Sequence, residues 1–171
     1  TTRIFPAFAE GAFIDAFVTA GSGGLNGATS AVFGPDGNLY HSSSSATNSV
    51  LRYNGTTGAF IDTFIAPGSG GLIGPQDLVF GPDGNLYVNS FTTDSVLRYN
   101  GTTGAFIDAF VPTGSGGLDG PTGLIFHTDG NLYVTSGLND RVLRYNGTTG
   151  AFINTFVSAG SGGLSVPEYM T

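Results

Sequence analysis

The sequence lacks cysteine, lysine and tryptophan, and only 10% of its 171 residues are charged. The absence of cysteine excludes a disulfide scaffold and any thiolate metal site. The five basic residues are all arginines and face 12 acidic residues, which gives a net charge of −7. This balance provides no basic patch for nucleic acid or for an anionic membrane surface. Asp or Gly interrupts every apolar stretch well short of the roughly 20 residues that a spanning helix needs. We therefore expect no nucleic-acid partner and no membrane span.

What the sequence has in abundance is internal repetition. The string RYNGTTGAF begins at Arg52, Arg98 and Arg144, so it recurs with a period of 46 residues. Aligned directly, residues 73–118 and 119–164 match at 31 of 46 positions. Self-similarity at a fixed period of this length is the signature of a repeat architecture, in which each copy forms one structural unit.

Each copy contains four short strand patterns separated by turn patterns. Pro-Asp-Gly and Asn-Gly sequences lie between the patterns, and both favour tight turns. In the second copy the expected strands are Gln76–Phe80, Asn85–Ser90, Ser95–Tyr99 and Ala105–Val111. Four antiparallel strands in about 46 residues predict the blade of a β-propeller. The predicted fold class is therefore all-β, a propeller of four-stranded blades, with about 3.7 blades in the chain.

The repeat also predicts the internal boundaries of one propeller or half-propeller domain, 1–171. A partial blade covers 1–25 and the first strand of a further blade covers 165–171. Full blades are expected at about 26–72, 73–118 and 119–164.

The blade sequence resembles a known class. The run GPDGNLYV followed by SVLRY and GAFIDTF resembles the NHL-type blade, and it is also similar to blades of streptogramin lyase and gluconolactonase-like propellers. The resemblance covers the chain after about Gly11. It implies a propeller fold, which serves binding modules and enzymes alike.

The residues give little support for a catalytic function. The resemblance implies that the enzymes of these families hold a metal through His, Glu, Asp or Asn at the axial end. His41 stands where other copies have Val88 and Val134, whereas His127 stands in a turn, so a shared metal is hard to build. A reacting centre also needs unequal groups, and near-identical blades repeat the same group. We predict no catalytic residue, no metal ligand and no cofactor.

Variation between copies indicates a candidate binding face. It concentrates in the loop between the second and third strands and at the start of the first strand, which lie at the same end of a propeller. Drift in tolerant loops is the alternative explanation. The candidate residues are Asn48, Gln76, Asp77, Asn89, Asp94, Thr122, Thr135, Asp140 and Glu168.

Two local motifs have a structural and a functional interpretation. The NGT sequences at Asn54, Asn100 and Asn146 are formal glycosylation sites, although Asn-Gly is also favourable turn chemistry. The repeated Asp-Gly-Asn resembles the start of a calcium loop but lacks the later acidic ligands, so we expect a turn.

Three functions follow from these observations. The first is a non-catalytic extracellular or cell-surface module for binding or self-assembly, since low charge and abundant Ser, Thr, Asn and Gly suit that location. The second is a metal-dependent lyase or lactonase using Asp77, Asn89 and Glu168, and the third is a multivalent carbohydrate-binding propeller.

The expected partner is the chain itself, with a glycan or protein ligand as a further possibility. With no initiator Met and no signal peptide, we expect a processed or excised chain. The partial blades at its two ends predict a strand-exchanged homodimer ring, with an open filament as the alternative.

Overall fold

The structure, a computed structural model, describes residues 15–170, and this part of the chain is all-β with three four-stranded antiparallel sheets. We call the sheets blades 1, 2 and 3. Blade 1 contains β1 (Ala28–Phe33), β2 (Leu39–Ser43), β3 (Ser49–Tyr53) and β4 (Phe60–Ile65). Blade 2 contains β5 (Pro75–Phe80), β6 (Leu86–Ser90), β7 (Ser95–Tyr99) and β8 (Phe106–Val111). Blade 3 contains β9 (Pro121–Phe126), β10 (Asn131–Ser136), β11 (Arg141–Asn146) and β12 (Phe152–Val157).

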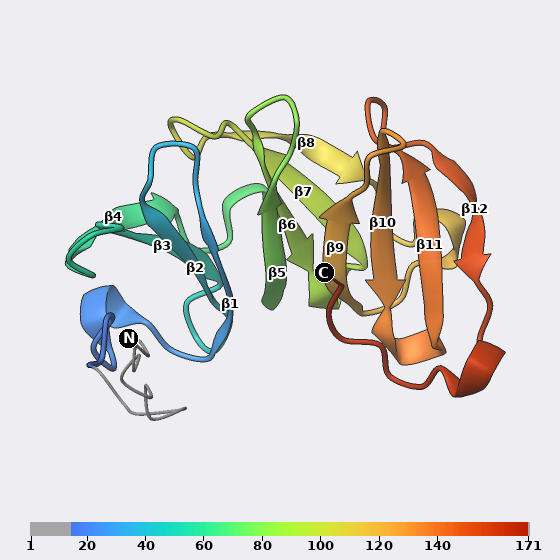
Figure 1. Ribbon diagram of the computed structural model, residues 1–171, viewed down its shortest axis with the longest axis horizontal. Coiled ribbons are helices and arrows are strands. Elements are labelled where there is room, and N and C mark those ends of the chain that lie inside the picture. The colour runs from blue at the N-terminus through green and yellow to red at the C-terminus, as the bar shows by residue number, and fades with distance from the viewer. Residues whose placement is uncertain (1–14, 171) are drawn as a thin grey trace, which may run out of the picture.

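The strands of each blade follow one another in chain order. The first strands meet, since β1 contacts β5 and β5 contacts β9, and the three blades fan out from them (Figure 1). In blade 2, β7 matches its predicted range and the other strands begin within one residue of theirs. The predicted all-β fold of four-stranded sheets is confirmed, and the count of 3.7 blades stays a prediction.

Short 3-10 turns that the sequence did not predict connect and complete the blades. The Gly-Ser-Gly-Gly-Leu sequences form η1 (Ser22–Gly24), η2 (Ser69–Gly71), η4 (Ser115–Gly117) and η6 (Ser161–Gly163). The loops between the second and third strands form η3 (Phe91–Thr93) and η5 (Gly137–Asn139). Among the described residues, no helix is long and apolar enough to cross a membrane.

The hydrophobic core lies in the seams between blades. Tyr40 of blade 1 makes edge-to-face contacts with Phe64 and with Phe80 of blade 2, at ring-centroid distances of 4.8 and 5.0 Å. The next seam repeats the arrangement around Tyr87, with Phe110 at 4.9 Å and Phe126 at 4.8 Å. Such aromatic pairs add to the free energy gained by burial, so each seam is held by its own three-ring cluster.

The two outer faces of the blade array lack this cover. Phe156 is 56% exposed, although its counterpart Phe110 is 5% exposed. Phe33 is 59% exposed on the opposite face, on blade 1. Its counterparts Phe80 and Phe126 are half-buried in the seams, so both positions are more exposed at the ends of the array than inside it.

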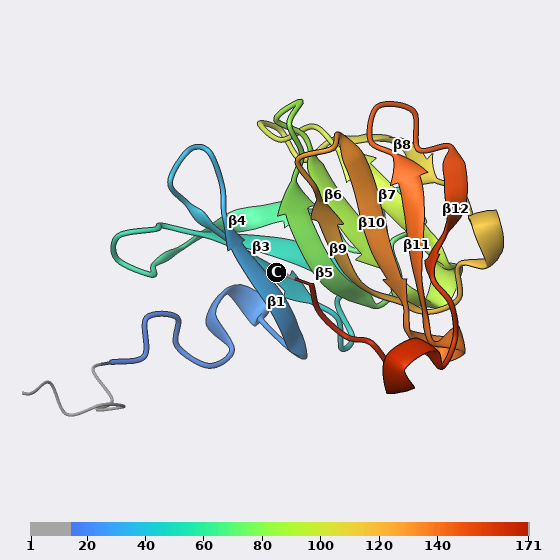
Figure 2. The ribbon, with the colours of Figure 1, turned by 45° about the vertical axis from the view of Figure 1, so that its right-hand side comes forward.

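The segment after β12 turns back toward the inner strands. Figure 2 shows it leaving η6 and running to the region where the first strands of the blades meet. Its Val166 N–H donates to Asp140 Oδ1 at 2.6 Å, and its Pro167 carbonyl accepts a hydrogen bond from Thr122 at 2.5 Å. Both contacts tie the segment 166–170 to blade 3.

Candidate functional site

The candidate binding-face residues lie at the end of the blades where the first strand begins and the second strand ends. The register places Pro75 opposite Ser90 in blade 2 and Pro121 opposite Ser136 in blade 3. The loop to the third strand leaves from the same end. The structure brings the two variable regions together here, and we call this the axial end.

Three of the candidates brace the start of the following repeat. Asn48, Asp94 and Asp140 all have positive φ, at 46°, 49° and 57°, in the left-handed region that Asn and Asp tolerate. The side-chain oxygen of Asn48 accepts the Gly74 N–H at 2.8 Å, and that of Asp94 accepts the Gly120 N–H at 2.8 Å. Because each side chain is engaged with the next repeat, these positions hold consecutive blades in place.

A pair of threonines carries a second contact between repeats. Thr29 donates its hydroxyl hydrogen to the Pro75 carbonyl at 2.8 Å, and Thr122 donates in the same way to the Pro167 carbonyl. Thr122 also lies 2.8 Å from the hydroxyl of Thr135. Of the two threonine candidates, Thr122 therefore acts between first strands, and Thr135 on the second strand β10 lies against it.

Asp77 joins all three blades at the axial end. Its Oδ1 accepts the Ser30 hydroxyl of blade 1 at 2.6 Å and the backbone N–H of Leu78 at 2.9 Å. Its Oδ2 accepts the Leu124 N–H of blade 3 at 3.0 Å. Asp77 is only 9% exposed, and hydrogen-bond donors from the protein occupy both of its oxygens. The sequence pattern marked Asp77 as variable but gave no sign of this bridging role.

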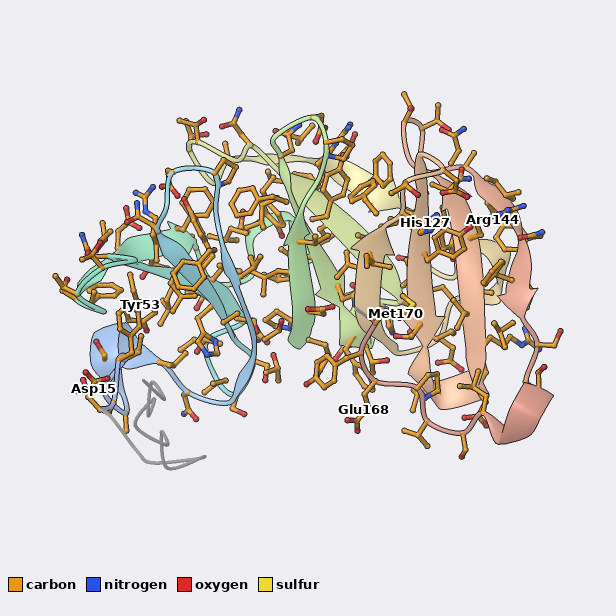
Figure 3. The ribbon with its side chains drawn as sticks, viewed as in Figure 1. Asp15, Tyr53, His127, Arg144, Glu168 and Met170 are labelled. Atoms are coloured by element: carbon orange, nitrogen blue, oxygen red, sulfur yellow. The ribbon has the colours of Figure 1, made fainter. Side chains whose placement is uncertain are left out.

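The remaining candidates differ in their surroundings. Asn89 is 0% exposed, and neither its Oδ1 nor its Nδ2 has a hydrogen-bond partner among the described residues. Gln76 is half-buried beside it, at the irregularity where β5 faces β6. Glu168 is exposed on the C-terminal segment, and its carbonyl accepts a hydrogen bond from Thr135 at 3.4 Å. In Figure 3 the Glu168 side chain points away from the blades.

The two histidines do not share a site. His41 lies in β2, and its Nδ1 is 3.0 Å from the Ser42 carbonyl. His127 lies in the turn before β10, with its Nδ1 3.2 Å from Asp129 Oδ1, and Figure 3 places it at the end opposite Glu168. Within residues 15–170, no group of three or more His, Cys, Asp or Glu side chains is placed to hold a metal ion.

Burial of His41 makes the free energy of unfolding depend on pH. Burial lowers the pKa of His41 below its ordinary value of 6.5, although its contact with the Ser42 carbonyl opposes the shift. At pH below about 6.5 the unfolded chain therefore binds a proton that the folded chain resists, and stability is lost as the pH falls. We expect the His41→Val variant, which carries the residue of blades 2 and 3, to lose less stability between pH 7 and pH 5 in urea unfolding. An equal loss in variant and parent would contradict this assignment.

The motifs with two interpretations form turns. Asn100 Oδ1 accepts the backbone N–H groups of Thr102 and Thr103, at 3.0 and 2.9 Å, and Asn54 and Asn146 do the same in their own copies. Asp83 Oδ2 accepts from Asn85 and from the Tyr87 hydroxyl at 3.0 Å. Burial opposes these bonds, but together with Arg98 they lower the pKa of Asp83 below its ordinary value. The Asn side chains thus support the hairpin, and glycosylation at these positions stays a prediction.

Solved structures share this fold. The chain superposes on virginiamycin B lyase from Staphylococcus aureus with a TM-score of 0.57 and 19% identity, over 76% of this chain and 41% of that one. A streptogramin B lyase matches with a TM-score of 0.61 and 16% identity, over 85% and 44%. Hydrazine synthase of Kuenenia stuttgartiensis matches with a TM-score of 0.66 and 18% identity, over 95% and 41%.

These likenesses support a partial propeller and carry no activity over to the chain. Each identity lies below 20%, and the chain spans less than half the length of each of these proteins. A scan of known protein families and of curated proteins finds no match. The resemblance to streptogramin lyase-type propellers is therefore supported at the level of fold, and the NHL-type resemblance stays a prediction.

Proposed function

We propose that the chain is a non-catalytic propeller module that works outside the cell and assembles with a second copy of itself through its two open end faces. The observation that carries this proposal is the exposure of Phe33 and Phe156, at 59% and 56%, in positions that are buried at Phe110 and half-buried at Phe80 and Phe126 in the interior seams. Exposed apolar patches of this kind are typical of interaction sites.

The open face of blade 3 lacks one ring of the interior cluster. Tyr133 contacts Phe156 at 4.9 Å, as Tyr87 contacts Phe110, but the ring that corresponds to Phe126 of the next blade has no counterpart in the described residues. A hollow of about 360 Å³ lies there. Its lining is mostly apolar and consists of Ile125, His127, Tyr133, Val142, Phe156, Val157 and Met170.

The open face of blade 1 carries an exposed ring of the same kind. Phe33 ends β1 as Phe80 ends β5 and Phe126 ends β9, so it occupies the position that supplies the third ring in the seams. In the assembly Phe33 therefore packs against the blade that precedes blade 1, as Phe80 and Phe126 pack against the blades that precede theirs.

The segments that flank the blades support a shared blade in such an assembly. The segment 166–170 makes the inter-blade hydrogen bond of a first strand, because Thr122 binds Pro167 as Thr29 binds Pro75. On blade 1, Tyr53 donates to the Ser22 carbonyl at 2.7 Å, just as Tyr99 donates to Ser69 at 2.8 Å. Residues near Ser22 thus stand where the turn after a fourth strand stands in the other copies.

Two such chains form a ring with shared blades at its two junctions, and an open filament is the alternative if the ring fails to close. The ring predicts that segment 166–170 strengthens association by covering a strand edge. Residues 1–14 of the partial blade predicted over 1–25 lie outside the described residues.

A metal-dependent lyase or lactonase remains the competing function, with Asp77, Asn89 and Glu168 as its proposed ligands. The geometry does not favour it. Both oxygens of Asp77 already accept hydrogen bonds from protein donors, and the Glu168 side chain is exposed. A multivalent glycan binder with one site per blade is likewise not favoured, because Asn48, Asp94 and Asp140 are engaged in bracing.

Light scattering on the purified 171-residue chain tests the assembly. We expect a mass of at least twice the 17.4 kDa of one chain. The Phe33→Ser variant should shift the mass toward 17.4 kDa, because serine removes the ring that the partner face needs. As a matched control, Leu138→Ser removes an equally exposed side chain from η5 and should leave the mass unchanged. A stable single-chain mass for the parent protein would overturn the proposal.

A further inference from the structure

Blade 2 departs from its neighbours at three positions of the axial end. Gln76 replaces the threonine of the other blades, Asn89 replaces Ser42 and Thr135, and Asp77 replaces a serine and a glycine. The residue that follows in the second strand is serine in all three blades (Ser43, Ser90 and Ser136), so blades 1 and 3 serve as internal comparisons for these three changes.

In the control blades a small hydroxyl closes the irregularity in the first strand. Ser42 Oγ accepts the Ser30 N–H at 2.9 Å and donates to the Ser30 carbonyl at 3.0 Å. Thr135 Oγ1 does the same for Gly123, accepting its N–H at 2.5 Å and donating to its carbonyl at 3.2 Å. Each hydroxyl satisfies the backbone opposite it and is satisfied in return.

Asn89 breaks this pattern. Its carboxamide is fully buried, with both polar atoms unpartnered among the described residues. A buried donor or acceptor without a partner costs about 1–3 kcal/mol, so nearly all such groups in native proteins are paired. A side chain that serves only the fold would be the serine or threonine of the other blades, and the cost of Asn89 indicates that something else binds its amide.

Gln76 places a second carboxamide beside the first. The register pairs Pro75 with Ser90 and Leu78 with Val88, so the irregular residues 76–77 lie opposite Asn89. Gln76 is half-buried, and no hydrogen bond from its side chain to a described residue is seen, whereas Thr29 and Thr122 at this position bind the next repeat. Two carboxamides and the carboxylate of Asp77 therefore belong to residues that lie together at this irregularity of blade 2.

We propose that Gln76, Asp77 and Asn89 form a single binding site for a neutral ligand with adjacent hydroxyl groups, such as a sugar. A carboxamide offers a donor and an acceptor side by side, which matches two neighbouring hydroxyls. One ligand hydroxyl pairs with the half-buried Gln76 carboxamide, and its neighbour pairs with the Asn89 amide behind it. The site goes beyond the proposed assembly and does not depend on it.

The charge and bonding of Asp77 favour a neutral ligand. Its carboxylate repels anions, and Arg52 and Arg98 are engaged elsewhere with Asp62 and Asp108. A metal cation needs free carboxylate oxygens, but both oxygens of Asp77 already accept bonds from Ser30, Leu78 and Leu124. A hydroxyl can join such a network as one further donor.

Two-dimensional ¹H–¹⁵N NMR of the intact chain tests the site. The side-chain amide pair of Asn89 is identified by its loss in Asn89→Thr, and glucose, galactose, mannose and calcium chloride are titrated separately. We expect at least one sugar to shift the Asn89 amide pair saturably at millimolar concentration, with no response to calcium. In Asn89→Thr the other resonances of the site should no longer respond. Its thermal midpoint should rise by about 3 °C, because threonine can make the bonds of Thr135.

Two further variants keep the test decisive if Asn89→Thr does not fold. Gln76→Thr should weaken the response at least tenfold, whereas Asn154→Thr, an exposed change on β12, should leave it intact. No response to any sugar, a response to calcium alone, or an unchanged sugar response in Gln76→Thr would each overturn the proposal. If an internal water molecule is what binds the Asn89 amide, no sugar produces a response.

Discussion

The Gly104→Ala variant is expected to lose about 4 kcal/mol of unfolding free energy. Gly104 has a φ of +70°, and a Cβ added there meets the Phe64 carbonyl oxygen at only 1.9 Å. The close approach is structural, because Gly104 lies in the hairpin of blade 2 that packs against the last strand of blade 1. Alanine must therefore either strain the hairpin or push the two blades apart.

Gly114→Ala separates the two causes of this loss. Gly114 has nearly the same φ, +67°, but a Cβ there meets nothing within 4 Å. We expect a loss of about 1 kcal/mol, from the left-handed backbone alone. Urea unfolding of both variants measures the difference. Equal losses would show that the blades do not pack as closely at Gly104 as the structure has them.

The repeat made the fold predictable from the sequence. Strands such as Ser95–Tyr99 follow from short apolar stretches bounded by turn sequences, and three copies of the pattern reinforce each other. The seam clusters were not predictable in the same way. Tyr87 and Phe126 belong to different copies, and nothing in the local pattern says which aromatic side chains meet across a seam.

The candidate site was located by variation but not understood from it. Asn48, Asp94 and Asp140 share one loop position, and the sequence could not show that the side chain there binds the backbone of the following repeat. That bond depends on the left-handed conformation of the residue and on the angle between blades, which only the three-dimensional arrangement fixes. For Asn89, the sequence showed that blade 2 differs here from the Ser42 and Thr135 of the other blades. It could not show that the Asn89 side chain lacks hydrogen-bond partners among the described residues.

The second large expected effect concerns Phe110 and Phe156, which occupy equivalent positions in blades 2 and 3. Phe110 is 5% exposed and packs against Tyr87, so Phe110→Ala should cost the folded chain about 3–4 kcal/mol. Phe156 occupies the same place in blade 3 but is 56% exposed, so Phe156→Ala should cost the single chain less than about 1 kcal/mol. Burial by a neighbouring blade, and not the residue itself, sets the size of the effect.

Association should reverse this order. If the open face of blade 3 binds a second copy, Phe156→Ala removes a ring from the centre of that contact and should weaken association at least tenfold, measured by sedimentation across a concentration series. A Phe110→Ala chain that still folds should associate as the parent does, because its cavity lies in an internal seam. A Phe156→Ala chain that assembles with unchanged affinity would exclude this face from the interface, whatever mass the parent protein shows.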